Sequence, residues 1–506
     1  MPAPSLVRRV RAVAFLSGVL AAGASTLLGA QAPAAPVASA STTSAPRTPH
    51  QQLARAVYRE LVEINTVDSV GSTTRAAEAM ARRFRAAGFP AADVQVLAPP
   101  GKPNKGNLVV RYRGRQGAAG EKPLLLLAHI DVVAANRADW PSDPFVLRED
   151  GGYFMGRGVA DDKAMAAIFV ANLLRYKAEG WRPARDLVLA LTADEEGGDA
   201  NGVEYLLASH RGLVDAAYAL NEGGGGVLQG GRPVLHSVQA AEKVPVNLTL
   251  ATRNPGGHSS VPRPDNAITE LADALGKVGR YRFPVALNPV TRAFFARTAE
   301  VEPRADVAAA MRALGTADAA GDSAGVEAAA AALSRDPRFA SMLRTTCVAT
   351  RLSGGHAYNA LPQAASANVN CRVVPTSSEA EVTAALARVV ADTGVHIAPT
   401  LAGDHERFGA APSAVDPAVL AAVTDLTRGM WGAGVPVIPT MSTGATDGRF
   451  LRAAGVPTYG VSGIFSEPGE TNAHGQNEKL RVRSFYEGLD FLDRLVRRLA
   501  GGQAGM

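Results

Sequence analysis

Cysteine is scarce in this chain, with only Cys347 and Cys371 among 506 residues. A zinc site made of thiolates needs more cysteines, so a zinc–cysteine cluster is excluded. The two cysteines flank a predicted hairpin centred near Asn359 and could face each other across antiparallel strands. Both a disulfide, which an oxidising compartment permits, and two buried free thiols are consistent with this placement.

Long apolar runs and basic blocks are also missing from most of the chain. After Gly29 no apolar run is long enough to cross a bilayer. The net charge of +5 comes without a cluster of basic residues, so nucleic acid is not expected as a partner.

The N-terminal residues have the pattern of a secretory signal peptide. Arginines precede an apolar stretch over 12–29, and small residues follow it. We assign 1–32 to the signal, with Ala24 as another choice of cleavage point, and 33–49 to an Ala/Pro/Ser/Thr-rich linker. An uncleaved membrane anchor and a twin-arginine signal are the alternatives. The pattern predicts an exported protein, periplasmic or secreted, with no stable membrane insertion after cleavage.

The remaining composition is that of a soluble globular protein, and its length favours two domains. Helix and strand patterns alternate over 50–242 and again over 408–506, which predicts one α/β domain with a mainly parallel sheet. The expected helices cover 50–62, 74–87, 163–177, 416–431 and 484–500, and the expected strands 107–112, 124–128, 187–192, 216–220 and 458–461.

A different pattern over 243–407 predicts a smaller domain inserted into the first. Its β-α-β-β-α-β order is that of a ferredoxin-like α+β domain, and we call it the lid. An Ala-rich segment, 281–344, interrupts the lid and is expected to be helical. We find no chemistry in this segment.

Polar side chains follow three buried apolar runs, at the point where each predicted strand ends. His129 and Asp131 follow the first run, Glu195 and Glu196 the second, and Glu222 the third. Sites in open α/β sheets lie beyond the carboxyl ends of the strands. Each residue alone is typical of a solvated loop, but three strand ends together favour a shared site.

Imidazole and carboxylate ligands without cysteine suit zinc in a hydrolytic site. Asp161, before a predicted helix, and His474, in a late loop, extend the set. Asp161 or Asp162 could instead cap that helix. The set exceeds the needs of one catalytic zinc, so two zinc ions sharing a carboxylate are expected. Asp131 can then orient His129, and Glu195 is free to act as general base on the zinc-activated water.

These motifs resemble those of the co-catalytic zinc aminoacylase/carboxypeptidase family, over nearly all of 50–500. The shared motifs are His-x-Asp, Gly-Arg-Gly-x-x-Asp-x-Lys, Asp-Glu-Glu-Gly, Asn-Glu-Gly-Gly and a late His-Gly-x-Asn-Glu. The segment 129–133, the later Trp-Pro-Ser-Asp-Pro-Phe over 140–145, and 161–163 are most similar to the carboxypeptidase S branch.

The resemblance implies a role for each residue of the site. His129 and Glu222 would bind one zinc, Glu196 and His474 the other, and Asp161 would bridge them, often beside a cis peptide bond in this family. Glu195 would be the base. In the lid, His258 would help to polarise the scissile carbonyl, sometimes from a partner subunit, and Asn359 and Arg372 would hold the substrate. Thr446 lies in a segment, 444–447, that matches a substrate-side loop.

The sequence thus predicts a di-zinc hydrolase that cleaves an amide bond and releases an amino acid, from a peptide or from an N-acyl amino acid. A homodimer through the lid and a monomer are both open. A non-catalytic exported peptide or zinc receptor is disfavoured because a receptor has no need of Glu195. A serine hydrolase is disfavoured because the segment 459–463 lacks the spacing of a nucleophile elbow.

Overall fold

The computed structural model describes residues 46–115, 121–400 and 410–501. The expected signal peptide and most of the linker lie outside these residues. Within the described part of the chain, no helix is both long and apolar enough to cross a membrane.

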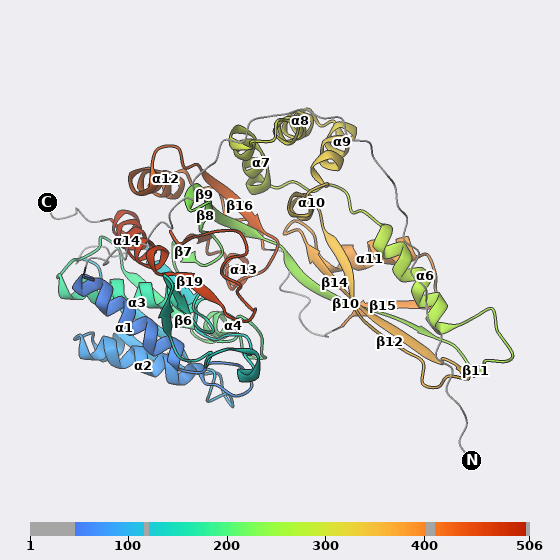
Figure 1. Ribbon diagram of the computed structural model, residues 1–506, viewed down its shortest axis with the longest axis horizontal. Coiled ribbons are helices and arrows are strands. Elements are labelled where there is room, and N and C mark those ends of the chain that lie inside the picture. Colours follow the sequence, from blue (N-terminus) through green and yellow to red (C-terminus); the bar gives the residue numbers. More distant parts are fainter. Residues whose placement is uncertain (1–45, 116–120, 401–409, 502–506) are drawn as a thin grey trace, which may run out of the picture. The chain divides into compact units, whose positions relative to one another are not determined.

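A ten-stranded sheet forms the centre of the larger domain (Figure 1), in the order β1-β2-β6-β3-β7-β17-β9-β8-β18, with β16 paired to β9. Four adjacent strands, β6, β3, β7 and β17, run parallel, and β1 and β2 are antiparallel additions at one edge. The strands are β1 (Val94–Leu97), β2 (Asn107–Tyr112), β3 (Leu124–His129), β6 (Leu187–Thr192), β7 (Tyr218–Asn221), β8 (Gly226–Gln229), β9 (Arg232–Glu242), β16 (Val437–Ser442), β17 (Thr458–Gly460) and β18 (Phe465–Ser466).

Helices cover both faces of this sheet, which explains why β3 and β6 are apolar throughout. Successive side chains of a strand point to opposite faces. Leu124 and Leu126 pack in one core cluster, while Leu125 and Leu127 pack in another. The first face is covered by α1 (Pro49–Glu63), α2 (Thr73–Ala86), α3 (Lys163–Ala178), α12 (Pro417–Trp431) and α14 (Val482–Leu499), and the second by α4 (Gly202–Ser209), α5 (Arg211–Val214) and α13 (Gly448–Ala453).

The lid is a separate antiparallel sheet with its own core, as the sequence predicted. Its strand order is β12-β14-β10-β15, and every pairing in it is antiparallel. The chain order is β10 (Val244–Arg253), α6 (Ala267–Arg280), β12 (Thr346–Gly354), β14 (Ala364–Val373), α11 (Glu379–Val390) and β15 (Val395–Pro399). Together with the mostly parallel sheet, this confirms the predicted α/β architecture with an inserted lid.

Cys347 and Cys371 face each other on the paired strands β12 and β14 and form a disulfide with an S–S bond of 2.07 Å. Of the two alternatives left open by the sequence, the structure therefore contains the bridged form. The bridge ties the outer strand of the lid sheet to its neighbour.

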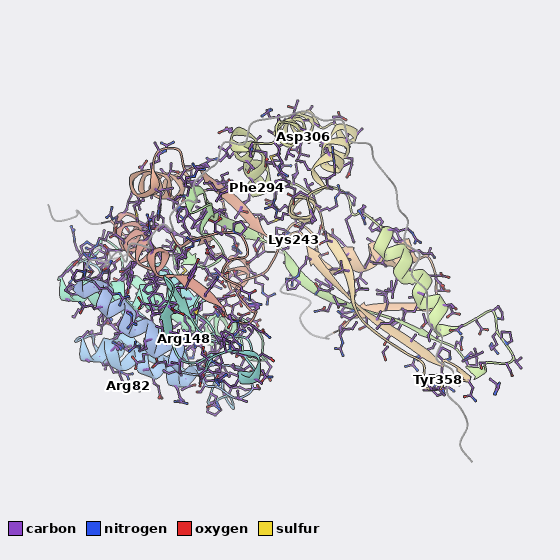
Figure 2. All side chains as sticks on the ribbon, viewed as in Figure 1. Arg82, Arg148, Lys243, Phe294, Asp306 and Tyr358 are labelled. Atoms are coloured by element: carbon purple, nitrogen blue, oxygen red, sulfur yellow. A yellow bond between two sulfur atoms is a disulfide. The ribbon has the colours of Figure 1, made fainter. Side chains whose placement is uncertain are left out.

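The Ala-rich insert is helical, as expected, and comprises α7 (Pro289–Val301), α8 (Ala305–Ala320), α9 (Ser323–Leu333) and α10 (Pro337–Leu343). Although the chain enters it from the lid, its apolar residues belong to the core cluster of the larger domain: Phe295 shares that cluster with Val437 and Met441 of β16. Lys243, labelled in Figure 2 where β9 leads into β10, donates to the carbonyls of Ser341 and Arg344 at the end of α10.

Candidate active site

Three neighbouring parallel strands deliver their final residues to one edge of the large sheet. β3 ends at His129, and Glu222 directly follows β7. β6 pairs with β3 on its other side and ends at Thr192, and the loop after it carries Glu195 and Glu196. The parallel pairing explains why residues nearly a hundred positions apart in the sequence converge.

All five predicted metal ligands come together. Asp161 lies between the two histidines, with Oδ1 3.0 Å from Nε2 of His129 and Oδ2 3.1 Å from Nε2 of His474. The same His474 nitrogen lies 2.9 Å from Oε1 of Glu196, and the His129 nitrogen 3.9 Å from Oε1 of Glu222. One carboxylate thus stands between two half-sites, which is the arrangement that two metal ions with a shared ligand require.

Donor atoms of two overlapping groups each lie within 4.8 Å of one another: His129, Glu195 and Glu222 in one, and His129, Asp161 and Glu196 in the other. Nitrogen and oxygen donors without sulfur suit zinc in a hydrolytic centre. Glu195 belongs to the first of these groups, so its carboxylate lies close to His129 and Glu222.

Asp131 contacts both His129 and the loop that carries Glu195 and Glu196. Its Oδ1 lies 3.5 Å from Nδ1 of His129, on the side of the ring away from Asp161. The two oxygens also accept the backbone N–H groups of Glu195 at 3.2 Å and of Glu196 at 3.0 Å. The sequence predicted the first contact and not the second.

The loop that presents Asp161 is built around the buried carboxylate of Glu478. This carboxylate accepts the backbone N–H groups of Gly158 at 2.9 Å, Ala160 at 2.7 Å and Asp161 at 3.2 Å, and pairs with buried Arg157 at 2.8 Å. The late His-Gly-x-Asn-Glu motif therefore contributes both a candidate ligand, His474, and the support for another, Asp161.

The bond between Asp161 and Asp162 is a cis peptide, the feature that the resemblance implied. Asp162 occupies the position before α3 but makes no capping hydrogen bond with its side chain. Asp161 bonds to the two histidines instead. The helix-cap interpretation therefore does not describe either side chain.

Three acids of the site, Glu195, Glu196 and Glu222, are held where ionisation is unfavourable without a cation, whereas the two histidines lower the pKa of Asp161. Burial is the main cause that raises the pKa of Glu195 to about 9 and that of Glu196 to about 7, and it raises the pKa of Glu222 strongly. The contact with Asp161 raises the pKa of His474 to about 9. A divalent cation among these groups would favour the ionised acids and the neutral imidazoles. The donor set therefore fits a metal centre.

The predicted substrate residues of the lid are not joined to the ligand cluster by any hydrogen bond or ion pair among the described residues. His258, in the short strand β11 (Gly257–His258), and Asn359 are exposed. Nδ1 of His258 lies 2.7 Å from the hydroxyl of Ser260. Arg372 is half-buried on β14, and within the described chain it has no acidic partner.

Thr446 is 7% exposed, and its hydroxyl is already engaged. It donates to Glu242 at 2.8 Å and accepts from Asn221 at 3.2 Å. Glu242 also pairs with buried Arg452 at 2.6 Å. Sequence reasoning missed Glu242 and Arg452, because Glu242 ends β9, whose sequence is not a continuous apolar run.

The structure gives no support to a serine nucleophile at Ser462. Its hydroxyl donates to the carbonyl of Gly224 at 2.9 Å, and within the described chain no histidine contacts it. A serine nucleophile needs a base within hydrogen-bond reach.

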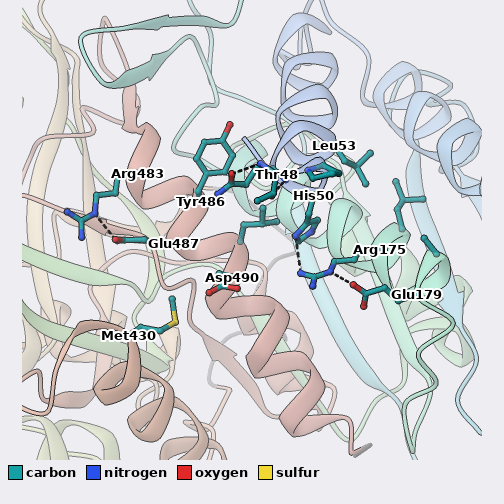
Figure 3. Close-up of a pocket in the computed structure, with 15 residues that line it drawn as sticks. Thr48, His50, Leu53, Arg175, Glu179, Met430, Arg483, Tyr486, Glu487 and Asp490 are labelled. Atoms are coloured by element: carbon teal, nitrogen blue, oxygen red, sulfur yellow. Dashed lines mark hydrogen bonds and ion pairs between the residues drawn. The ribbon is translucent and has the colours of Figure 1, made fainter. Parts of the chain in front are cut away.

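Two pockets differ in their relation to this site. A pocket of about 200 Å³ is lined by Asp161 and Glu222 and so belongs to the site. A larger one, of about 940 Å³, is bordered by α1, α3 and α14, with His50, Arg175 and Tyr486 in its wall (Figure 3). It contains none of the candidate ligands.

Residues 125–498 match the model of peptidase family M20/M25/M40. The human N-fatty-acyl-amino acid synthase/hydrolase PM20D1 is 28% identical, over 74% of each chain, and the probable carboxypeptidase S-like 2 of Dictyostelium discoideum is 26% identical, over 77% of this chain and 74% of its own. Among solved structures, the M20 family metallo-carboxypeptidase Sso-CP2 of Sulfolobus solfataricus superposes with a TM-score of 0.64 at 18% identity, over 88% of this chain and 99% of its own.

Proposed function

We propose that this chain, which belongs to peptidase family M20/M25/M40 and is a metallohydrolase of amide bonds, releases a free amino acid from a dipeptide or a peptide C-terminus. The proposal rests above all on the position of Asp161 between His129 and His474, with Glu195 beside them. Two zinc ions are the proposed cofactors.

His129 and Glu222 would hold one ion, Glu196 and His474 the other, and Asp161 both. When bound, the pair would polarise the scissile carbonyl and lower the pKa of the attacking water towards ~7.

Glu195 supplies the proton transfers. Its carboxylate takes a proton from the water as the water oxygen bonds to the carbonyl carbon. The same carboxyl group then gives that proton to the leaving nitrogen as the C–N bond breaks. The second proton of the water stays on the new carboxyl group and passes to the amine, so the products are a carboxylate and a protonated amine.

Lid residues are proposed to act on the substrate. His258 would donate to the carbonyl oxygen, and Asn359 and Arg372 would bind the substrate carboxylate, for which a guanidinium with no acidic partner in the described chain is suited. Thr446 remains a proposed substrate-side residue through its loop rather than its hydroxyl, which Glu242 occupies.

An N-acyl amino acid is the second candidate substrate, because one relative is named as an N-fatty-acyl-amino acid synthase/hydrolase. Both candidates share the same bond chemistry and differ in the group on the acyl side.

We propose export to the periplasm or the cell exterior, supported by the leader pattern and by the disulfide between Cys347 and Cys371. We also propose a homodimer that pairs through the lid, because β12 is the outermost of the described lid strands and is mostly exposed.

A hydrolysis screen tests the proposal. The purified chain is supplied with zinc and assayed on dipeptides and on N-acyl amino acids. We expect amino acid release that a chelator abolishes, that zinc restores and that a serine-directed reagent leaves unchanged. Hydrolysis that survives full removal of the metal would contradict the proposal.

A further inference from the structure

The peptide bond that precedes Glu195 is held at both ends. Its carbonyl, that of Asp194, accepts the side-chain amide of Asn201 at 3.1 Å. Its N–H, that of Glu195, donates to Asp131 at 3.2 Å. Asp194 itself has a φ of 57°, in the left-handed region. Two bonds on opposite sides of one peptide plane fix its rotation, and this rotation sets the direction in which the side chain of Glu195 leaves the backbone.

Asn201 has only one orientation that satisfies its surroundings. Its Oδ1 accepts the N–H groups of Val203 at 3.0 Å and Glu204 at 3.1 Å, at the start of α4. Its Nδ2 must therefore point the other way, towards the carbonyl of Asp194 and towards Oδ1 of Asp447 at 2.6 Å. The bond to an ionised carboxylate is the stronger of the two.

Asp447 is buried directly before α13, but its side chain makes no capping hydrogen bond to that helix. Its other oxygen accepts the hydroxyl of Thr192, the last residue of β6, at 3.1 Å. The neighbouring Thr446 is held by Glu242 through both its N–H and its hydroxyl. Asp447 thus connects the end of β6 to Asn201. Asn201 in turn bonds to the carbonyl of Asp194, in the loop that carries Glu195 and Glu196.

We propose that Asp447 is a positioning residue for Glu195, acting through Asn201 and the carbonyl of Asp194. The inference rests on the proposed role of Glu195 as base. Both side-chain partners of Asp447 named above, Thr192 and Asn201, lie outside the set of candidate ligands. Besides the charge of Asp447, which contributes to the raised pKa of Glu195, its effect would reach the reaction through the orientation of one peptide plane.

The zinc-loaded full chain carrying Asp447→Asn tests this. An amide at 447 has one acceptor oxygen and cannot accept from both Thr192 and Asn201, so one of these two hydrogen bonds is lost and Asn201 is held less firmly. We expect kcat to fall about 10²-fold, as for a displacement of about 1 Å in an active site. KM and the zinc content should stay close to those of the parent chain. Unchanged kcat, or loss of zinc in parallel with kcat, would overturn the proposal.

A double variant distinguishes a positioning role of Asp447 from a contribution to stability alone. In Asn201→Asp/Asp447→Asn, residue 447 can donate to residue 201, which restores their bond and the melting temperature. The carboxylate now at position 201 would have no N–H for the carbonyl of Asp194, so we expect kcat to remain low. Recovery of kcat together with the melting temperature would show that only support was lost and would overturn the proposal.

Two further variants serve as a substitute test and as a control. If Asp447→Asn fails to fold, Thr192→Val takes its place as the test. It removes one hydrogen bond to Asp447 with little change of shape, and it should lower kcat severalfold. Asp493→Asn is the matched control: Asp493 is a buried acid of α14 that pairs with Arg497 at 2.9 Å, and its loss should lower the melting temperature without changing kcat.

Hydrogen exchange distinguishes this inference from the proposed function. In the zinc-loaded Asp447→Asn chain, the amides of 193–197 should exchange faster than in the parent chain, whether or not any amide is hydrolysed. Absence of turnover in the parent chain would contradict the proposed function alone, and unchanged exchange would contradict the positioning role.

Discussion

At the scale of single residues, Asp131 shows how one carboxylate can serve several groups. Its carboxylate accepts the N–H groups of Glu195 and Glu196, and its Oδ1 lies 3.5 Å from Nδ1 of His129, which bonds to the backbone carbonyl of the same Asp131 at 3.2 Å. Partners of this kind around a metal site are worth about 10- to 100-fold in metal affinity or activity. The arrangement makes Asp131 a support of both the proposed ligands and the proposed base.

Asp131→Asn should therefore weaken zinc binding by about 10-fold or more. An asparagine retains one acceptor oxygen, whereas the N–H groups of Glu195 and Glu196 each bond to a separate carboxylate oxygen. Competition with a chromophoric chelator measures the affinity. Asp199→Asn, which changes an exposed acid that lies in the loop after β6 and pairs with Lys102, is the control and should bind zinc normally. Unchanged affinity in Asp131→Asn would contradict this role.

Glu478 is the second acid whose loss should matter beyond its own contacts. Glu478→Gln leaves the buried guanidinium of Arg157 without its charge partner, and breaking such a pair costs about 3 kcal/mol or more in the free energy of unfolding. Denaturant titration measures it. The exposed pair of Asp490 and Arg494 is the comparison, and Asp490→Asn should change stability by less than about 1 kcal/mol. Equal losses of unfolding free energy in Glu478→Gln and Asp490→Asn would contradict the structural role given to Glu478.

Residues of the site were predictable from the sequence where they directly follow an apolar run, as His129, Glu195 and Glu222 do. Asp447 and Asn201 were not assigned because their importance lies in a contact between residues 246 positions apart. Nothing local distinguishes Asn201 from any other helix cap. Their function depends on which strand ends are neighbours in space, and that becomes visible only in the folded sheet.

At the scale of elements, continuous apolar runs identified the central strands, and β9 and β16 were missed. β16 contains Pro439, and proline cannot donate to a strand partner. β16 has a single partner, β9, among the described strands, so the missing N–H is tolerated there. The first half of β9 alternates between more and less exposed residues and so is not a continuous apolar run, although the strand ends buried at Glu242. The signal that identified the central strands was therefore absent from β9.

The disulfide is the element-scale feature with the clearest energetic consequence. It closes a segment with a sequence separation of 24 residues between β12 and β14. The chain-entropy model gives about 3.5 kcal/mol for a loop of this length. Cys347→Ser/Cys371→Ser should lower the unfolding free energy of the lid by about this amount, measured by denaturant titration. Reductant should have the same effect on the parent chain and none on the variant; a variant as stable as the oxidised parent would contradict the prediction.

At the scale of the whole molecule, the exposed outer strand of the lid bears on assembly. On β12, Val348 is 59% exposed and Leu352 is 72% exposed, which is unusual for an apolar edge strand of a protein that stays monomeric. A second copy pairing along this strand would cover both side chains. Charged side chains on edge strands are a common means of preventing such pairing.

Val348→Lys/Leu352→Lys should therefore convert a dimer into a monomer, as measured by light scattering coupled to size exclusion. Val234→Lys, which changes an exposed valine of β9 outside the lid, is the control and should leave the dimer intact. A monomeric parent chain, or a variant that stays dimeric, would contradict the proposed assembly.

The central claim is that the adjacent acids divide two tasks, with Glu196 binding metal and Glu195 moving protons. The most direct test measures zinc content and kcat in Glu195→Gln and Glu196→Gln side by side. Glu195→Gln should keep both zinc ions and lose about 10³-fold in kcat, within the range for a general base. Glu196→Gln should lose one of the two ions. Loss of zinc from Glu195→Gln, or near-normal turnover in it, would contradict the account.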